Sequence, residues 1–137
     1  MIAAVIDCSA LVELMSQGGL AAIWDNPELS GCMLAAPHLV DAEFVNAVRG
    51  LSRRNPELGE RFEQLLAEYH RLDLTRFEHA PLTWEAWRLR DRMTAYDGMY
   101  VALAADLGLP LITADRRLAR GARGVCDVRL LEELTAA

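Results

Sequence analysis

Four acidic residues lie in or at the edge of apolar segments, where carboxylates are uncommon. They are Asp7 in AAVIDCSALVEL, Glu43 in PHLVDAEFVNAV, Asp97 in TAYDGMYVALAA and Asp115 in LPLITADRRL. Burying a lone carboxylate is costly, so such groups are normally paired, protonated or bound to a cation. Four of them in a small chain suggest one shared site. The simplest occupant of that site is a hard divalent metal such as Mg²⁺ or Mn²⁺.

Short apolar runs alternate with amphipathic segments along the chain, which predicts alternating strands and helices. Strands are expected over 2–6, 32–36, 72–76, 110–114 and 125–128. Helices are expected over 10–17, 20–25, 37–53, 56–69, 82–93 and 97–107, with a short Arg-rich helix after Asp115. This order predicts an α/β fold in which helices cover both faces of a central parallel sheet.

The predicted elements explain how the four acids could meet. Asp7 and Asp115 each end a predicted strand, and ligands of parallel sheets bind beyond the carboxyl ends of the strands. Glu43 lies inside a predicted helix, close to its apolar stripe. Asn46 follows Glu43 by one turn, where it could orient that carboxylate or belong to a solvated helix face.

The bulk composition is that of a packed globular protein. The 137 residues, 53% hydrophobic and 25% charged, predict a single domain over 1–137. No apolar run reaches the ~18–20 residues that cross a bilayer, and the N-terminus lacks a basic leader, so we expect no membrane association and a cytoplasmic protein. The three cysteines and three histidines lack zinc-ligand spacing, so reduced thiols are expected.

All 14 basic residues are arginines, in a chain of net charge −6. Guanidinium groups suit phosphate recognition, although a GC-rich coding bias also explains the count. A cluster directly after the last acidic motif could contact an RNA backbone, or its members could pair with neighbouring acids. This cluster consists of Arg116, Arg117, Arg120 and Arg123.

Other carboxylate chemistries fit the motifs less well. A haloacid-dehalogenase-type phosphatase needs a DxD motif, but Ser9 stands where the second Asp belongs. A receiver domain needs a lysine, and nucleotide-binding glycine motifs are missing. The favoured chemistry is hydrolysis of a phosphodiester. Carboxylates alone would repel a phosphate backbone, but a divalent cation neutralises them and lowers the pKa of a bound water. A phosphatase of small substrates stays open as an alternative.

The segments VIDCSALVEL, PHLVDAEFVNAV and TAYDGMYVALAADLGLPLITADRRLA resemble PIN-domain ribonucleases, and more narrowly the VapC-type toxins of bacterial type II toxin–antitoxin systems. The resemblance covers nearly the whole chain and is least diagnostic over 54–82. It implies a three-layer α/β/α PIN-like domain with four to five short parallel strands. It further implies a Mg²⁺- or Mn²⁺-dependent endoribonuclease acting on tRNA or rRNA, a cognate VapB-like antitoxin, toxin homodimers and toxin–antitoxin hetero-oligomers.

The resemblance also assigns roles to single residues. It places the family's acidic metal-binding quartet on Asp7, Glu43, Asp97 and Asp115. Ser9 matches a small hydroxyl position near the metal, and Thr113 matches the Thr of a TxD motif. Gly98 stands where such motifs commonly have Ala, and we expect it to weaken the helix start slightly.

Structural alternatives exist for the same residues. Asp7 and Asp115 could cap the helices that follow them, Asp97 could interact with the dipole of its own helix, and Thr113 could simply fill a strand. A catalytically silent module that binds RNA or protein as a scaffold is therefore the main alternative function. Retention of all four acids argues against it.

Two expectations concern residues outside the acidic motifs. Trp84 and Trp87 lie one turn apart in a predicted helix, and we expect both rings to pack in the core. Asp41 and Asp91 lack apolar neighbours on both sides, so they are interpreted as surface residues.

Overall fold

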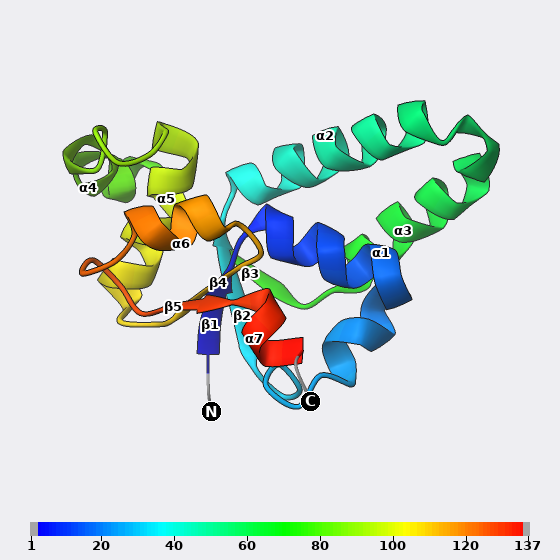
Figure 1. The fold of residues 1–137 in the computed structure, drawn as a ribbon, viewed down its shortest axis with the longest axis horizontal. Helices are drawn as coiled ribbons and strands as arrows, with labels where there is room; N and C mark the ends of the chain where they lie inside the picture. Colours follow the sequence, from blue (N-terminus) through cyan, green and yellow to red (C-terminus); the bar gives the residue numbers. More distant parts are fainter. Residues whose placement is uncertain (1–2, 136–137) are drawn as a thin grey trace.

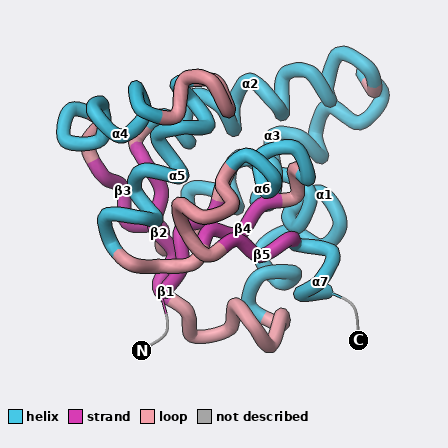
Figure 2. The backbone as a smooth tube through the Cα atoms, turned by 60° about the vertical axis from the view of Figure 1, so that its left-hand side comes forward, coloured by secondary structure: helices cyan, strands magenta, loops and turns pink. Residues whose placement is uncertain are grey.

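The computed structural model describes residues 3–135 as a parallel sheet with helices around it (Figures 1 and 2). The strands are β1 (Ala3–Ile6), β2 (Met33–Pro37), β3 (Leu74–Phe77), β4 (Leu111–Thr113) and β5 (Val128–Leu130). The helices are α1 (Cys8–Trp24), α2 (Leu39–Arg54), α3 (Gly59–Arg71), α4 (Thr83–Arg88), α5 (Ala95–Leu107), α6 (Arg116–Gly121) and α7 (Leu131–Thr135), with 3₁₀ turns at Pro56–Leu58 and Ala80–Leu82.

The sheet confirms the predicted fold class. Its five strands are all parallel and run in the order β3-β2-β1-β4-β5. The chain moves outward from β1 through β2 to β3, and then returns to the other side of β1 for β4 and β5. The direction therefore changes between β1 and β4, and ligands of open α/β sheets bind at such a switch point.

Helices cover the sheet on opposite sides (Figure 1). α1 packs against α2 and α3 on one side of the sheet. On the other side α5 packs against β1, β2 and β4, and α4 packs against α5. The central strand β1 is buried along Ala4, Val5 and Ile6, as expected for a strand covered on both faces. Within residues 3–135, no helix is both long and apolar enough to cross a membrane.

α1 is interrupted where the sequence predicts a helix end. Gly18 and Gly19 leave helical geometry, and Gly19 has a φ of +61°, a conformation that favours glycine. Helical structure then resumes as far as Trp24, which matches the expected turns over 20–25.

Several predicted bounds shift by a few residues. Pro37, expected in the first turn of a helix, is the last residue of β2; it pairs with Phe77 at a position beyond the β1 register. α5 starts at Ala95 rather than at Asp97, because Thr94 caps it. Ile2, the first residue of the expected strand over 2–6, lies outside the described residues.

The expected helix over 82–93 is wrong in extent, and the placement of its tryptophans is wrong as well. α4 ends at Arg88, and Trp84 and Trp87 are 75% and 60% exposed. The buried positions are instead Leu82, Ala86 and Leu89, which follow the spacing of a helical stripe. The two tryptophans fall on the opposite side of that turn.

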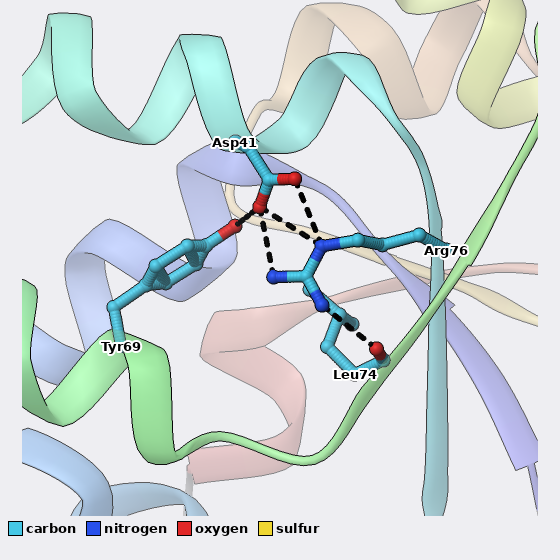
Figure 3. A network of polar contacts seen from close by, with 4 residues as sticks. All are labelled: Asp41, Tyr69, Leu74 and Arg76. Atoms are coloured by element: carbon cyan, nitrogen blue, oxygen red, sulfur yellow. Dashed lines mark hydrogen bonds and ion pairs between the residues drawn. The ribbon is translucent and has the colours of Figure 1, made fainter.

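Asp41 is not a plain surface residue, because it joins α2 to α3 and β3 (Figure 3). Nε of Arg76 donates to both Asp41 carboxylate oxygens at 3.0 and 2.9 Å, and Nη2 donates to Oδ1 at 2.8 Å. The Tyr69 hydroxyl donates to the same carboxylate at 2.6 Å. The Tyr69 ring also stacks on Phe44, with centroids 4.0 Å apart, so the network fixes the first turns of α2.

Candidate active site

Asp7 is the most buried acid of the predicted quartet, at 4% exposure. It follows β1 and caps α1, because its Oδ1 accepts a hydrogen bond from the Ala10 backbone N–H at 2.9 Å. The Ser9 hydroxyl donates to Oδ1 at 2.7 Å, and the Thr113 hydroxyl donates to Oδ2 at 2.5 Å. Burial raises the Asp7 pKa to about 6 in spite of these bonds, so the carboxylate is held in an unfavourable ionised form at neutral pH.

Ser9 and Thr113 link the ends of β1 and β4. Their hydroxyl oxygens lie 3.3 Å apart, and Ser9 Oγ accepts the backbone N–H of Ala114 at 3.0 Å. Thr113 Oγ1 accepts the backbone N–H of Asp115 at 3.0 Å. Both hydroxyls predicted to support the site therefore contact Asp7 and also position the chain that leads to Asp115.

Glu43 reaches the site from α2. The Tyr100 hydroxyl of α5 donates to its Oε1 at 2.6 Å. Burial raises the Glu43 pKa, and the negative charges of Asp97 and Asp7 raise it further, whereas the bond from Tyr100 lowers it. Asn46 is exposed, and no hydrogen bond joins it to Glu43 within residues 3–135. The group that orients Glu43 is thus Tyr100. In the sequence, Tyr100 is one of several apolar residues of a predicted helix, so the pattern does not indicate this role.

Asp97 lies in the first turn of α5, where its backbone N–H donates to the Thr94 hydroxyl at 3.3 Å. Its carboxylate accepts no hydrogen bond from the described part of the chain. Burial raises the Asp97 pKa, the charge of Asp115 raises it further, and Arg117 opposes this. An acid that is half-buried, repelled by a second acid and not hydrogen-bonded is suited to accept a cation.

Asp115 has a double role. As the N-cap of α6, its Oδ1 accepts the backbone N–H groups of Arg117 at 2.8 Å and Leu118 at 3.2 Å. Its charge also acts on Asp97. The capping alternative considered for Asp7 and Asp115 is therefore real for both, and it does not compete with a role in the site.

The four acids share one electrostatic neighbourhood. Asp7 and Glu43 both sense the charge of Asp97, and Asp97 senses that of Asp115. Among residues 3–135, however, no three His, Cys, Asp or Glu side chains already converge on one point as a metal-ligand set. The donor chemistry, four carboxylates that form no ion pair within the described residues, fits a hard divalent ion that keeps several of its waters.

The arginines beside the acids differ from one another. Arg116 makes two hydrogen bonds to Glu132, at 2.9 and 2.7 Å, so it is engaged with α7. Arg117 acts electrostatically on Asp97, and Arg120 is exposed. Cys8, next to Asp7, has a pKa raised to about 12 by burial and by Glu43 and Asp7, so it is not a reactive thiolate.

Comparisons with a family model and with individual relatives both match this chain to PIN-domain ribonucleases. Residues 4–124 match the family model described as PIN domain. Ribonuclease VapC1 of Mycobacterium tuberculosis is 35% identical over 128 residues, 93% of this chain and 96% of that protein. Ribonuclease VapC9 of the same organism is 32% identical over 127 residues, covering 93% of this chain and 97% of that protein.

Solved structures show the same fold. PAE2754 from Pyrobaculum aerophilum superimposes with a TM-score of 0.67 and 25% identity, over 97% of this chain and 86% of that one. The VapBC2 structure from Rickettsia felis, bound to a DNA fragment from its promoter, gives a TM-score of 0.66 at 17% identity, over 95% of this chain and 98% of the matched one.

Proposed function

Because this chain belongs to the PIN-domain family and, within it, to the VapC ribonucleases, we propose that it is a Mg²⁺- or Mn²⁺-dependent endoribonuclease whose ion is held by the acidic quartet. The quartet consists of Asp7, Glu43, Asp97 and Asp115. Family membership makes the chain a ribonuclease toxin of a toxin–antitoxin system.

The observation that carries the proposal is the buried Asp7 carboxylate, which lies close to like charges. Burial raises its pKa to about 6, and Asp97 adds repulsion. Among the described residues, no ion pair joins Asp7, Glu43, Asp97 or Asp115 to a basic side chain. Arg117 opposes the repulsion only at Asp97 and without an ion pair, so a cation from solution would stabilise the gathered acids.

Each residue of the site has a definite task in this scheme. The quartet would hold the ion directly or through water. The bound ion would act as a Lewis acid that promotes the attack of water on the scissile phosphorus. Ser9 and Thr113 hold the Asp7 carboxylate in place, and Tyr100 holds Glu43. Arg117 and Arg120, which are exposed on α6, would contact the RNA backbone.

The partners follow from the same family. The matched Rickettsia felis structure is a toxin–antitoxin pair, which supports a VapB-like antitoxin for this chain. We propose that the active protein is a cytoplasmic homodimer, that the antitoxin covers the acidic site, and that tRNA or rRNA is the target.

The test is incubation of the purified protein with total tRNA and rRNA in Mg²⁺, in Mn²⁺ or in EDTA. We expect cleavage only with metal, and a loss of at least about a hundredfold in Asp7→Asn and Asp97→Asn, the upper end of the effect of removing an outer-shell partner. Asp91→Asn is the matched control, because Asp91 is exposed and does not belong to the quartet. Cleavage that persists in EDTA, or equally in all variants, contradicts the proposal. A wild-type protein that binds RNA without cutting it would instead be a silent scaffold.

A further inference from the structure

Three large aromatic side chains on α4 and the first turn of α5 are exposed to solvent. Trp84 is 75% exposed, Trp87 60% and Tyr96 68%. Side chains of this size are normally covered, and exposed aromatic groups gathered in one region commonly mark a binding surface. We refer to Trp84, Trp87 and Tyr96 as the aromatic surface.

α4, which carries Trp84 and Trp87, packs closely against α5, the helix that carries Asp97. Ala86 of α4 lies against Gly98 of α5, where a Cβ atom would meet the Ala86 backbone and side chain at 3.3 Å. Gly98 thus allows α4 and α5 to pack closely. The sequence predicted only that Gly98, in place of the commoner Ala, weakens the start of the helix. Since a helix is about 10–12 Å across, the exposed side of α4 lies about one helix diameter from Gly98, the neighbour of Asp97.

The charge of this region is opposite to that of the whole chain. Residues 83–123 contain seven arginines and five acids, a net charge of +2, whereas the chain as a whole carries −6. Arg90 stacks over the Trp87 ring, with its guanidinium carbon 4.4 Å from the centroid. Arg92 donates to the Arg123 carbonyl at 3.2 Å, which places the α4–α5 connection beside the C-terminal end of α6.

Aromatic rings interleaved with arginines indicate a nucleic-acid strand rather than an apolar protein partner. Bases stack on exposed rings, guanidinium groups contact both the rings and the phosphates, and neither contact needs a particular base. Phosphates also match the net positive charge of residues 83–123. A purely apolar interface would not explain why Arg90 lies on Trp87.

We propose that Trp84 and Trp87, with Arg90, form a platform on which unpaired bases of the RNA substrate stack while the strand passes to the acidic quartet. This inference rests on the proposed ribonuclease function and specifies its substrate, namely RNA with an unpaired segment flanking the cleaved bond. The tryptophans lie on the side of α4 away from Gly98, so the strand has to pass around half of the helix, a path of about 16–19 Å. At about 3.4 Å of rise per nucleotide, about five nucleotides cover this path.

The test measures binding in the absence of cleavage. A fluorescein-labelled single-stranded RNA of mixed sequence is titrated with protein in EDTA, and anisotropy gives the Kd. Trp84→Ala/Trp87→Ala should bind at least about fivefold more weakly for each stacked base lost, whereas Trp84→Phe/Trp87→Phe should retain most of the affinity. The matched control is Trp24→Ala, because Trp24 is 54% exposed at the end of α1, across the sheet from α4 (Figure 1).

An abasic ribose–phosphate strand of the same length separates stacking from charge. The wild type should bind it as weakly as the double alanine variant binds RNA. The inference is overturned if wild type and double alanine variant bind RNA equally, if the abasic strand binds as tightly as RNA, or if the wild type binds neither. It is also overturned if sedimentation shows that the alanine pair changes the oligomeric mass while RNA affinity stays unchanged, because the rings would then cover a protein partner.

These outcomes are independent of the cleavage assay. A protein that binds RNA through the two tryptophans but cuts nothing in Mg²⁺ or Mn²⁺ contradicts the proposed function and leaves the platform intact. A protein that cuts RNA without using the tryptophans contradicts only the platform.

Discussion

Asp41 and Glu43 lie two residues apart in α2, and their carboxylates have opposite electrostatic surroundings. Asp41 accepts hydrogen bonds from Arg76 and Tyr69, and the Arg76 guanidinium holds its pKa below the ordinary value. Glu43 accepts one hydrogen bond, from Tyr100, and burial raises its pKa, with Asp97 and Asp7 adding to the effect. One helix therefore carries a neutralised acid and an acid without a counter-charge.

The difference separates stabilising acids from binding acids. Where an acid holds α2, α3 and β3 together, the chain supplies an arginine as its partner. Near Asp7 and Glu43 no such partner is supplied among the described residues, although the chain has 14 arginines. A charged group left unpaired in a protected position is a cost to the fold, and such costs are typical of functional sites.

The largest expected effect on stability comes from Asp7→Asn. Burial raises the folded-state pKa of Asp7 to about 6, so the folded protein holds this proton more tightly than the unfolded chain does. Stability therefore falls as the pH rises from about 4 to 6, and the cost above pH 6 is about 2–3 kcal/mol. Without metal, Asp7→Asn should raise the free energy of unfolding at pH 7.5 by about 1–3 kcal/mol and give no gain at pH 4.

Urea unfolding followed by circular dichroism at the two pH values measures this effect. Asp91→Asn serves as the control, because Asp91 is exposed. Destabilisation by Asp7→Asn at both pH values would mean that the ionised Asp7 carboxylate stabilises the fold, as Asp41 does, and would contradict this prediction.

A smaller and opposite effect is expected on the side of the neutralised acid. Arg76→Met leaves the Asp41 carboxylate without its cation, and the pair is 30% and 45% exposed. Fully buried pairs cost about 3–5 kcal/mol when broken and surface pairs about 0–1, so after solvent screening we expect a loss of about 1–2 kcal/mol. Arg116→Met, which removes an exposed pair with Glu132, should produce no measurable change.

The pH dependence sharpens this second prediction. Because Arg76 lowers the Asp41 pKa, the pair stabilises the fold above the ordinary pKa of Asp and loses its effect as the pH falls through the lowered value. The difference between wild type and Arg76→Met should therefore shrink below about pH 4. For Asp7→Asn the difference instead opens as the pH rises. A constant difference at every pH would assign the role of Arg76 to packing alone.

The sequence was sufficient to predict the parallel sheet, and the structure places Asp7 and Asp115 shortly after the neighbouring strands β1 and β4. Asp7 and Asp115 follow short apolar runs that predict strands. In a parallel sheet the carboxyl ends of all strands lie at the same edge, so both residues are expected at that edge. The resemblance predicts Ser9 near the metal and Thr113 in the TxD motif, but it does not predict that both hydroxyls donate to the Asp7 carboxylate.

Other features of the site and the fold could not be predicted from the sequence, because they depend on contacts between residues far apart in the chain. Tyr100 reads as one more apolar residue of α5, and only the packing of α5 against the strands brings its hydroxyl to Glu43. Asp41 reads as exposed because its partners, Tyr69 and Arg76, lie 28 and 35 residues away. Trp84 and Trp87 were expected in the core because large aromatic residues one turn apart usually are. The smaller side chains of Leu82, Ala86 and Leu89 occupy that face instead.

The most direct test of the account is a Mn²⁺ titration of two variants changed at neighbouring positions of α2, followed by electron paramagnetic resonance of the free ion. The two variants are Glu43→Gln, which retains an oxygen for the Tyr100 hydrogen bond, and Asp41→Asn. We predict that Glu43→Gln weakens Mn²⁺ binding at least about tenfold, while Asp41→Asn binds as the wild type does. Equal binding by wild type and Glu43→Gln, or an equal loss in both variants, would contradict the claim that α2 presents one acid to the fold and the other to a cation.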